Sequence, residues 1–290
     1  MESAIEIRAR VEAWEFANEY PASSLPGEGD ALFCRLVAER TRGKLAIRAL
    51  ADHGPGSREQ LHAVAEGRIA MADMFSGALG EVEPVFALST LPFTANGIGH
   101  ARALYEATRP GYEAAFERHR QKLLFTTPWP PSGLWTRAPV TSVEDLAALR
   151  IRTYDETGAR LFARLGARAS VVSFADLPAR IAARDIDAVL SSGDGGAGHV
   201  LWEHFATFTA IGYAMPLSFA TLNTAKWNAL EAALREAVVE AARETEARQW
   251  RSIEGRLEEN YARMRAHGVT IVTQVPAALG ARLREAAGER

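Results

Sequence analysis

The chain has 290 residues, a formal net charge of −3 and a calculated pI of about 6.2. That length can bury one large core or two modest ones, and the balanced charge predicts neither nucleic acid nor an acidic membrane surface as a partner. The single cysteine, Cys34, excludes an internal disulfide and a multi-cysteine metal site, and we expect a buried structural thiol there. No apolar run reaches the roughly 20 residues of a membrane span, so we expect no direct membrane insertion.

The first part of the chain is predicted to alternate strands and helices. In chain order we expect a strand at 7–14, a loop through Pro21 and Pro26-Gly27, a helix at 30–42, a strand at 45–50, a helix at 57–66, a strand at 69–74, a helix at 100–120 and a strand at 123–126.

The densest turn signal is Pro128-Trp129-Pro130-Pro131-Ser132-Gly133, and we predict that the chain crosses there into a second domain. The chain is expected to return near Met215-Pro216. Domain I is therefore predicted to comprise residues 1–129 and 216–250, and domain II residues 130–215 and 251–290.

The window from 144 to 192 predicts strand, helix, strand, helix and strand. A short strand at 150–153 precedes a helix at 155–165. Val171 and Val172 are expected to start a buried strand, followed by a helix at 177–183 and a strand at 186–190. Such alternation is typical of a mostly parallel sheet with helices on both faces, which binds ligands at the carboxyl ends of its strands. Arg152 lies near one of these ends.

Residues 193–198 read Gly-Asp-Gly-Gly-Ala-Gly, which matches the dinucleotide pattern Gly-x-Gly-x-x-Gly. Three observations favour another role. The motif follows a strand-helix-strand unit instead of opening one, Asp194 would bring negative charge to a pyrophosphate, and no acidic residue ends a strand about 20 residues later. We expect a flexible loop and a helix N-terminus that donates N–H groups near a ligand carboxylate.

Residues 224–267 are almost continuously helical in pattern, with Gly268 as the stop signal. A helix of this length would brace both domains or break near Gly255. A dimeric coiled coil is the alternative, but the apolar spacing of Leu230, Leu234 and Val238 lasts only a few turns.

These motifs, taken in order, resemble the solute-binding proteins of tripartite ATP-independent periplasmic (TRAP) transporters. The resemblance rests on Gly43-Lys44, on Gly67-Arg68-Ile69-Ala70-Met71, on Leu91-Pro92-Phe93, on Arg150-Ile151-Arg152-Thr153 with the helix to Leu165-Gly166-Ala167, and on Asn223 to Leu230. It implies an α/β fold of two domains, like that of periplasmic binding proteins, with a ligand cleft between the domains and a long bracing C-terminal helix.

The resemblance also implies a carboxylate anchor at Arg152, because Arg holds a planar carboxylate through two parallel hydrogen bonds. Strand alternation alone does not separate Arg152 from Arg150. Ser132 and Ser192 fall where relatives that bind sugar acids carry a second Arg and an Asn. Trp129, Phe75 and Trp135 are predicted to form an aromatic pocket, with core packing as the alternative for each.

We therefore expect a binding protein, not an enzyme, that captures a small carboxylate and delivers it to membrane permease subunits by hinge closure. The predicted ligand is an apolar or aromatic monocarboxylate. No cofactor is implied, although some relatives bind a metal with a keto acid. The N-terminus carries no signal peptide, so a periplasmic location assumes its removal. The alternatives are an oxidoreductase that uses Gly193–Gly198 and a ligand-sensing module.

Overall fold

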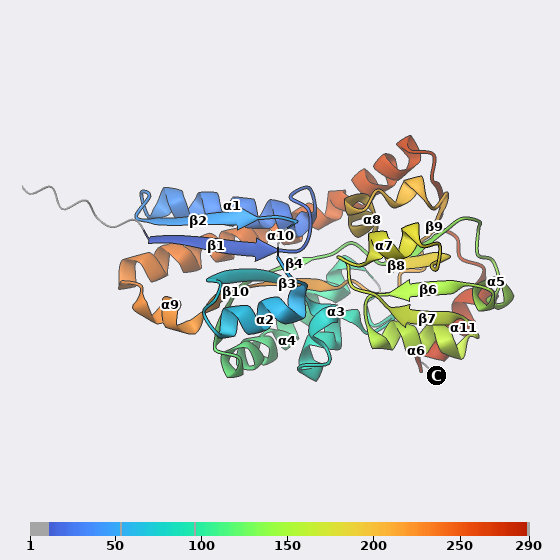
Figure 1. The fold of residues 1–290 in the computed structure, drawn as a ribbon, viewed down its shortest axis with the longest axis horizontal. Helices are drawn as coiled ribbons and strands as arrows, with labels where there is room; N and C mark the ends of the chain where they lie inside the picture. The colour runs from blue at the N-terminus through green and yellow to red at the C-terminus, as the bar shows by residue number, and fades with distance from the viewer. Residues whose placement is uncertain (1–11, 53, 96, 289–290) are drawn as a thin grey trace, which may run out of the picture.

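The computed structural model describes residues 12–52, 54–95 and 97–288, which form two β-sheets covered by helices (Figure 1). The strand order is β2-β1-β3-β10-β4 in the first sheet and β11-β9-β5-β8-β6-β7 in the second. Both sheets are mixed. β10 is antiparallel to its neighbours in the first sheet, and β5 is antiparallel to its neighbours in the second. The expectation of mostly parallel pairing is therefore only partly met.

The first half contains β1 (Glu12–Asn18), α1 (Leu25–Arg40), β2 (Leu45–Leu50), α2 (Ser57–Ala65), β3 (Met71–Phe75), α3 (Ser76–Leu79), the 3-10 helix η1 (Pro84–Thr90), α4 (Ile98–Arg118), β4 (Gln121–Pro128), β10 (Leu217–Asn223) and α9 (Thr224–Ala229). The second half contains β5 (Gly133–Thr136), α5 (Val143–Ala147), β6 (Arg150–Thr153), α6 (Glu156–Arg164), β7 (Arg168–Val171), α7 (Leu177–Ala182), β8 (Ala188–Ser191), α8 (Gly193–Gly198), the 3-10 helix η2 (Leu201–Glu203), β9 (Thr207–Thr209), β11 (Thr270–Val272) and α11 (Ala277–Ala287).

Three segments connect the sheets: one between β4 and β5, one between β9 and β10, and the stretch from β10 to β11 that contains a long helix. The first two of these segments pair with each other. The N–H of Trp129 donates to the carbonyl of Pro216 (2.8 Å), that of Ser132 to Ala214 (2.9 Å), and that of Tyr213 to Ser132 (2.9 Å). These three backbone hydrogen bonds hold the two short segments side by side where they pass between the halves.

The long helix α10 (Ala232–Ala266) spans 35 residues, a length of about 52 Å. It packs on α1 and β4 in the first half and on α8 and β11 in the second (Figure 1). The predicted brace is therefore confirmed. The alternative, a break near Gly255, does not occur, because Gly255 lies inside the helix. The helix instead breaks from α9 near Leu230.

Three predicted boundaries need correction. The loop expected at Pro26-Gly27 is the first turn of α1, since proline is tolerated there and the Ser24 hydroxyl accepts from the Gly27 N–H. The strand expected to start at Val171 ends there instead. β7 is an exposed edge strand, and Val171 is 41% exposed. The strand predicted at 7–14 lies mostly outside the described residues, and β1 begins at Glu12.

A pair of buried carboxyl groups lies under the carboxyl end of β1. Asp30 and Asp73 are 2% and 1% exposed. Asn18 links Asp30 to the chain that follows β1, because its Nδ2 donates to Asp30 (2.6 Å) and its Oδ1 accepts from the Tyr20 N–H (2.8 Å). Burial raises the pKa of both carboxyl groups, that of Asp73 to about 7. The pair therefore favours a protonated state in the folded protein.

This shift predicts the sign of a stability change with pH. The pKa of Asp73 is raised from 3.8 to about 7, so the stability that its proton supports is fully present below pH 4 and lost as the pH rises through 7. Asp73→Asn keeps the group neutral. At pH 8 the variant should melt several degrees above the wild type, and at pH 4.5 that gain should vanish, as measured by circular dichroism. Asp187→Asn is the control. Arg150 lowers the pKa of Asp187 to about 2, so this variant should melt below the wild type at pH 8. An equal Asp73→Asn effect at both pH values would contradict this interpretation.

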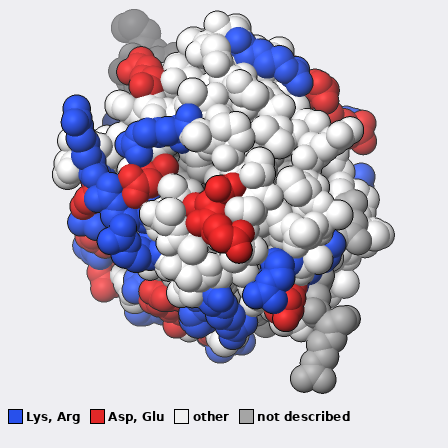
Figure 2. Space-filling model, turned by 90° about the vertical axis from the view of Figure 1, so that its right-hand side faces the viewer, with Lys and Arg blue, Asp and Glu red and all other residues white. Residues whose placement is uncertain are grey.

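Three remaining expectations concern the membrane, metals and Cys34. Within the described ranges no helix is both long and apolar enough to cross a membrane, and no group of three or more His, Cys, Asp or Glu side chains could hold a metal ion. The face in Figure 2 carries interspersed side chains of both charge signs. Cys34 is partly rather than fully buried, and desolvation raises the pKa of its thiol to about 12.

Candidate ligand-binding site

Arg152 is the third residue of β6 and is only 4% exposed. Its Nε donates to the carbonyl of Val172 (2.8 Å) and its Nη1 to the carbonyl of Leu190 (3.2 Å). These bonds fix the plane of the guanidinium and leave Nη2 without a partner in the described part of the chain. Burial lowers the pKa of Arg152, which reflects the cost of keeping this positive charge away from water.

Arg150 differs from Arg152 in its partners. Its Nε and Nη2 bind both oxygens of Asp187, at 2.7 and 2.8 Å, so its charge is already paired within the protein. Across the described residues no carboxylate lies within salt-bridge distance of Arg152. A buried charge without a partner is costly, so the site is suited to an anion brought by a ligand.

Five aromatic side chains line a small cavity of ≈ 30 Å³ around Arg152, namely Tyr20, Phe75, Trp129, Tyr154 and Phe174. Tyr20 lies at the centre of the cluster, with ring centroids 4.7 Å from Trp129, 4.3 Å from Phe174 and 6.1 Å from Phe75. The Phe75 ring meets the Tyr154 ring edge-on at 5.2 Å. The cavity therefore offers ring surface from both halves of the molecule.

The sheet topology explains why these residues meet. Tyr20, Phe75 and Trp129 lie at or just after the carboxyl ends of β1, β3 and β4, which run in one direction in the first sheet. Tyr154 and Phe174 follow β6 and β7, which are parallel in the second sheet. The carboxyl ends of both sets face the connection between the sheets, where ligands of α/β sheets bind.

Two predicted serines line the same cavity. The Ser132 hydroxyl lies 3.3 Å from the Tyr154 hydroxyl, and Ser132 is 2% exposed. The Ser192 hydroxyl oxygen accepts from the Gly195 N–H (3.1 Å) at the start of α8. Each serine thus has an internal partner, which makes it a weaker polar anchor than a free Arg or Asn would be.

Trp135 is not brought into this cavity. It is fully buried in a separate core cluster, where its ring meets Phe208 at 5.3 Å, and its Nε1 donates to the Ser192 carbonyl at 3.4 Å. Its alternation within β5 turns the side chain toward α8 instead of the ligand side. Trp135 therefore packs in the core, as the alternative stated, and its side chain supports the turn that carries Ser192.

Residues 193–198 form the short helix α8 and not the expected flexible loop. The glycines allow close packing, since a Cβ at Gly196 would lie 2.2 Å from the Trp135 ring. The Gly195 and Gly196 N–H groups bind Ser192, so these two are occupied within the turn. Asp194 is buried and binds Arg256 of α10 (2.7 Å) and the Leu25 N–H of α1 (2.7 Å). The motif therefore has a structural explanation without a dinucleotide.

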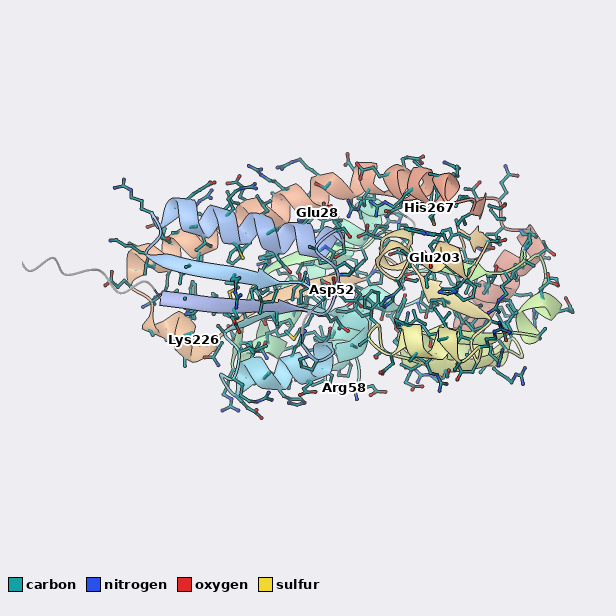
Figure 3. The ribbon with its side chains drawn as sticks, turned by 45° about the horizontal axis from the view of Figure 1, so that its top comes forward. Glu28, Asp52, Arg58, Glu203, Lys226 and His267 are labelled. Carbon is teal, nitrogen blue, oxygen red and sulfur yellow. The ribbon has the colours of Figure 1, made fainter. Side chains whose placement is uncertain are left out.

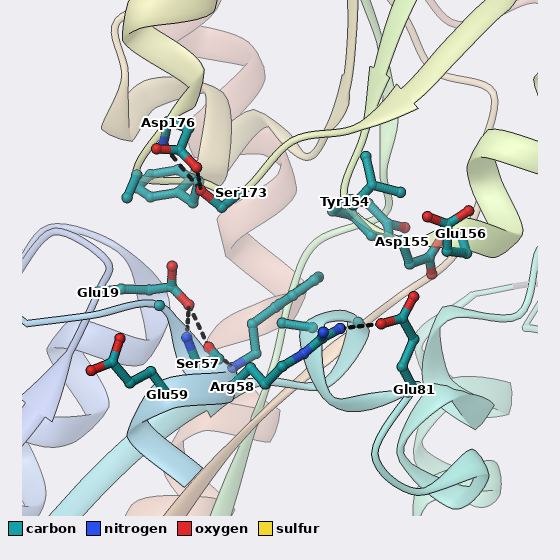
Figure 4. A pocket seen from close by; sticks show the side chains of 18 of the residues that line it. Glu19, Ser57, Arg58, Glu59, Glu81, Tyr154, Asp155, Glu156, Ser173 and Asp176 are labelled. Atoms are coloured by element: carbon teal, nitrogen blue, oxygen red, sulfur yellow. Dashed lines mark hydrogen bonds and ion pairs between the residues drawn. The ribbon is translucent and has the colours of Figure 1, made fainter. Parts of the chain in front are cut away.

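A wider cavity of ≈ 700 Å³ shares Tyr20, Phe75, Arg152, Tyr154 and Phe174 with the small one (Figure 4). Its walls carry several charged residues from both halves, including Glu19, Arg58, Glu81, Asp155 and Asp176. Arg58 is paired with Glu81, and Asp176 accepts from the Ser173 hydroxyl (2.7 Å). Arg152 and the aromatic rings thus border a cleft with a polar rim.

Sequence reasoning missed Glu19, Tyr20, Tyr154 and Phe174. The signal that could have found them is their position directly after strands, combined with the rule that ligands bind at carboxyl strand ends. Placing the first strand at 7–14 put that end four residues too early for Glu19 and Tyr20.

The model of the family described as "Bacterial extracellular solute-binding protein, family 7" matches residues 16–288. The chain belongs to this family. The predicted resemblance to TRAP solute-binding proteins is confirmed, and so is the predicted two-domain α/β fold with a bracing helix. Comparison with curated proteins found no match.

Solved structures of extracytoplasmic solute receptors superpose closely on the chain. DctP7 of Bordetella pertussis, an extracytoplasmic solute receptor that binds pyroglutamic acid, is 25% identical with a TM-score of 0.91, over 95% of this chain and 92% of that one. DctP6 of the same organism, which also binds pyroglutamic acid, is 26% identical with a TM-score of 0.90 and the same coverage. A TRAP periplasmic solute-binding protein of Pseudomonas aeruginosa with bound L-malate is 16% identical with a TM-score of 0.88, over 95% and 97%.

Proposed function

We propose that this family 7 receptor captures a small monocarboxylate in the cleft and delivers it to the permease subunits of a TRAP transporter outside the cytoplasm. The observation that carries the proposal is Arg152, a buried cation with no carboxylate partner among the described residues, which faces a cavity lined by aromatic rings. Arg152 would bind the ligand carboxylate through its Nη2 group and the remaining N–H of Nη1. This role requires neither catalysis nor a cofactor.

The body of the ligand is proposed to be compact, with mainly apolar or aromatic surface and few polar groups. Trp129 and Phe75 supply ring surface, whereas Ser132 and Ser192 are the polar groups at positions where sugar-acid receptors carry stronger anchors. The similar receptors DctP7 and DctP6 bind pyroglutamic acid, which is a compact cyclic monocarboxylate. Pyroglutamate is therefore the first acid to test.

Capture is proposed to occur by closure of two domains, residues 1–129 with 216–250 and residues 130–215 with 251–290. The paired connections near Trp129 and Ala214 are short, so they suit a hinge, and the ligand would contact residues from both sides. Binding energy at Arg152 and the rings would stabilise the closed state, which the permease would recognise.

A thermal-shift panel tests this function. The panel contains pyroglutamate, mandelate, indole-3-acetate and 2-oxobutanoate as compact monocarboxylates, with malate as a dicarboxylate, galacturonate as a sugar acid and NAD as a dinucleotide. A compact monocarboxylate should give the largest stabilisation. The second charge of malate would have to be desolvated without an Arg partner, and the hydroxyl groups of galacturonate would meet Ser132 and Ser192 in place of Arg and Asn. The largest shift from malate or galacturonate would refute the proposed ligand class, and the largest shift from NAD would refute the proposed function.

A further inference from the structure

Glu19 is an acid deep in the ligand cleft that has no assigned role. It follows β1 directly, next to Tyr20, and lines the wide cavity with Arg152. The N–H of Ser57 donates to its Oε1 at 2.9 Å, and the Ser57 hydroxyl donates to the same oxygen. Ser57 is held in turn by the Phe75 N–H, which donates to its hydroxyl at 2.8 Å. Glu19 is therefore fixed by the start of α2 and the end of β3.

Only one of the two Glu19 oxygens is used by these bonds. Figure 4 shows the other oxygen turned away from Ser57 toward the side of the cavity that carries Ser173 and Asp176. This oriented acceptor lies in the same cavity as the unpaired Arg152. The cleft thus presents a buried donor group and a fixed acceptor group to one ligand.

The other acids of the cavity are less suited to contact a ligand held at Arg152. Glu81 is exposed and paired with Arg58, and Asp176 is exposed and bound to Ser173. Asp155 is deep, but its Oδ1 holds the Gly158 N–H at the start of α6 (2.8 Å), and its Oδ2 is closed off from solvent. Glu59 and Glu156 lie exposed at the rim.

We propose that Glu19 selects ligands that carry an N–H donor near the carboxylate held by Arg152, such as a lactam or a cyclic amino acid. This inference rests on the proposed function. A carboxylate accepts hydrogen bonds and repels an oxygen that offers only lone pairs, so the group opposite Glu19 must donate. Burial raises the pKa of Glu19, while Ser57 and Arg152 act to lower it. A donor from the ligand would favour the ionised form.

Two matched pairs of acids test the selection, each differing by N–H against O. The first is pyroglutamate against 5-oxotetrahydrofuran-2-carboxylate, and the second is proline against tetrahydrofuran-2-carboxylate. Isothermal titration of the full chain should give an N–H preference of about 10-fold or more in at least one pair, as expected for a hydrogen bond to a charged group. A preference in the first pair would indicate a neutral N–H donor, and a preference in the second pair a charged one. Equal affinities or an oxygen preference in both pairs would overturn the inference.

Glu19→Gln provides the second readout. The two Ser57 donors should retain the amide oxygen, so the amide NH₂ group faces the ligand as a donor. In this variant the preference for the N–H analogue should therefore disappear or reverse in favour of the oxygen analogue. Glu15→Gln, on the exposed side of β1, should keep the wild-type ratio. An unchanged ratio in Glu19→Gln, as expected if Glu19 were a protonated donor, would overturn the inference. Failure of all four acids to bind would overturn this selection, whereas stabilisation by another monocarboxylate of the thermal-shift panel would leave the proposed function standing.

Discussion

Arg152→Ala should weaken ligand binding by about 30-fold or more. Removing one partner of a buried, hydrogen-bonded charge pair costs binding free energy on the order of 2–5 kcal/mol. The ligand for this test is the acid that gives the largest thermal shift, and isothermal titration is the measurement. Arg152→Lys should also bind poorly, since an ammonium group cannot reproduce the planar fork that donates to Val172, Leu190 and a carboxylate together.

The unliganded Arg152→Ala protein should keep its fold and melt within a few degrees of the wild type. The substitution removes two hydrogen bonds to backbone carbonyls, but it also removes a charge that is desolvated without a counter-charge. Arg150→Ala is the matched control two residues earlier, because its partner is Asp187 and not a ligand. Affinity close to that of the wild type in Arg152→Ala, or an equal loss in Arg150→Ala, would contradict the assignment of the anchor.

Arg256→Ala should destabilise the protein by about 3–5 kcal/mol, the effect expected when one partner of a buried ion pair is removed. The Asp194 side chain is fully buried and that of Arg256 is 7% exposed, with 2.7 Å between Oδ1 and Nε. Arg256 also binds the Ser23 carbonyl (2.6 Å) and Glu28 (3.0 Å). Figure 3 labels Glu28, which lies in the first turn of α1. The pair therefore joins α8, α10 and the start of α1 at one point.

Urea denaturation of the unliganded protein measures this effect. Arg248→Ala is the control on the same helix, since its pair with Glu244 is exposed and should contribute less than about 1 kcal/mol. The double variant Asp194→Asn with Arg256→Gln should recover part of the loss, because neither buried charge is then left alone. A loss in Arg256→Ala no larger than that in Arg248→Ala would show that the buried pair contributes little.

Much of the fold follows from local pattern. The strand that carries Arg152 and the helices α2 and α7 were predicted within one residue of their observed bounds, because their apolar periods and end signals are strong. The errors have identifiable causes. Pro26 in a first helical turn was interpreted as a loop, and Val171 in an exposed edge strand was interpreted as the start of a buried one.

The site was harder to predict than the fold, because it depends on contacts between distant residues. Alternation gives Arg150 and Arg152 the same face, and only the Asp187 partner, 37 residues further along, distinguishes the paired arginine from the unpaired one. Asp194 and Arg256 are 62 residues apart, and no local pattern joins them. Trp135 is a similar case. It was predicted to line the aromatic pocket, but its ring packs against Gly196 of α8, and no local pattern in the sequence indicates that contact.

The most direct measurement is a crystal structure of the protein with the acid that gives the largest thermal shift. The account predicts a carboxylate at hydrogen-bond distance from the Arg152 guanidinium, with the body of the ligand against Tyr20, Phe75 and Trp129. A ligand lying along residues 193–198, or a carboxylate held by residues other than Arg152, would contradict it.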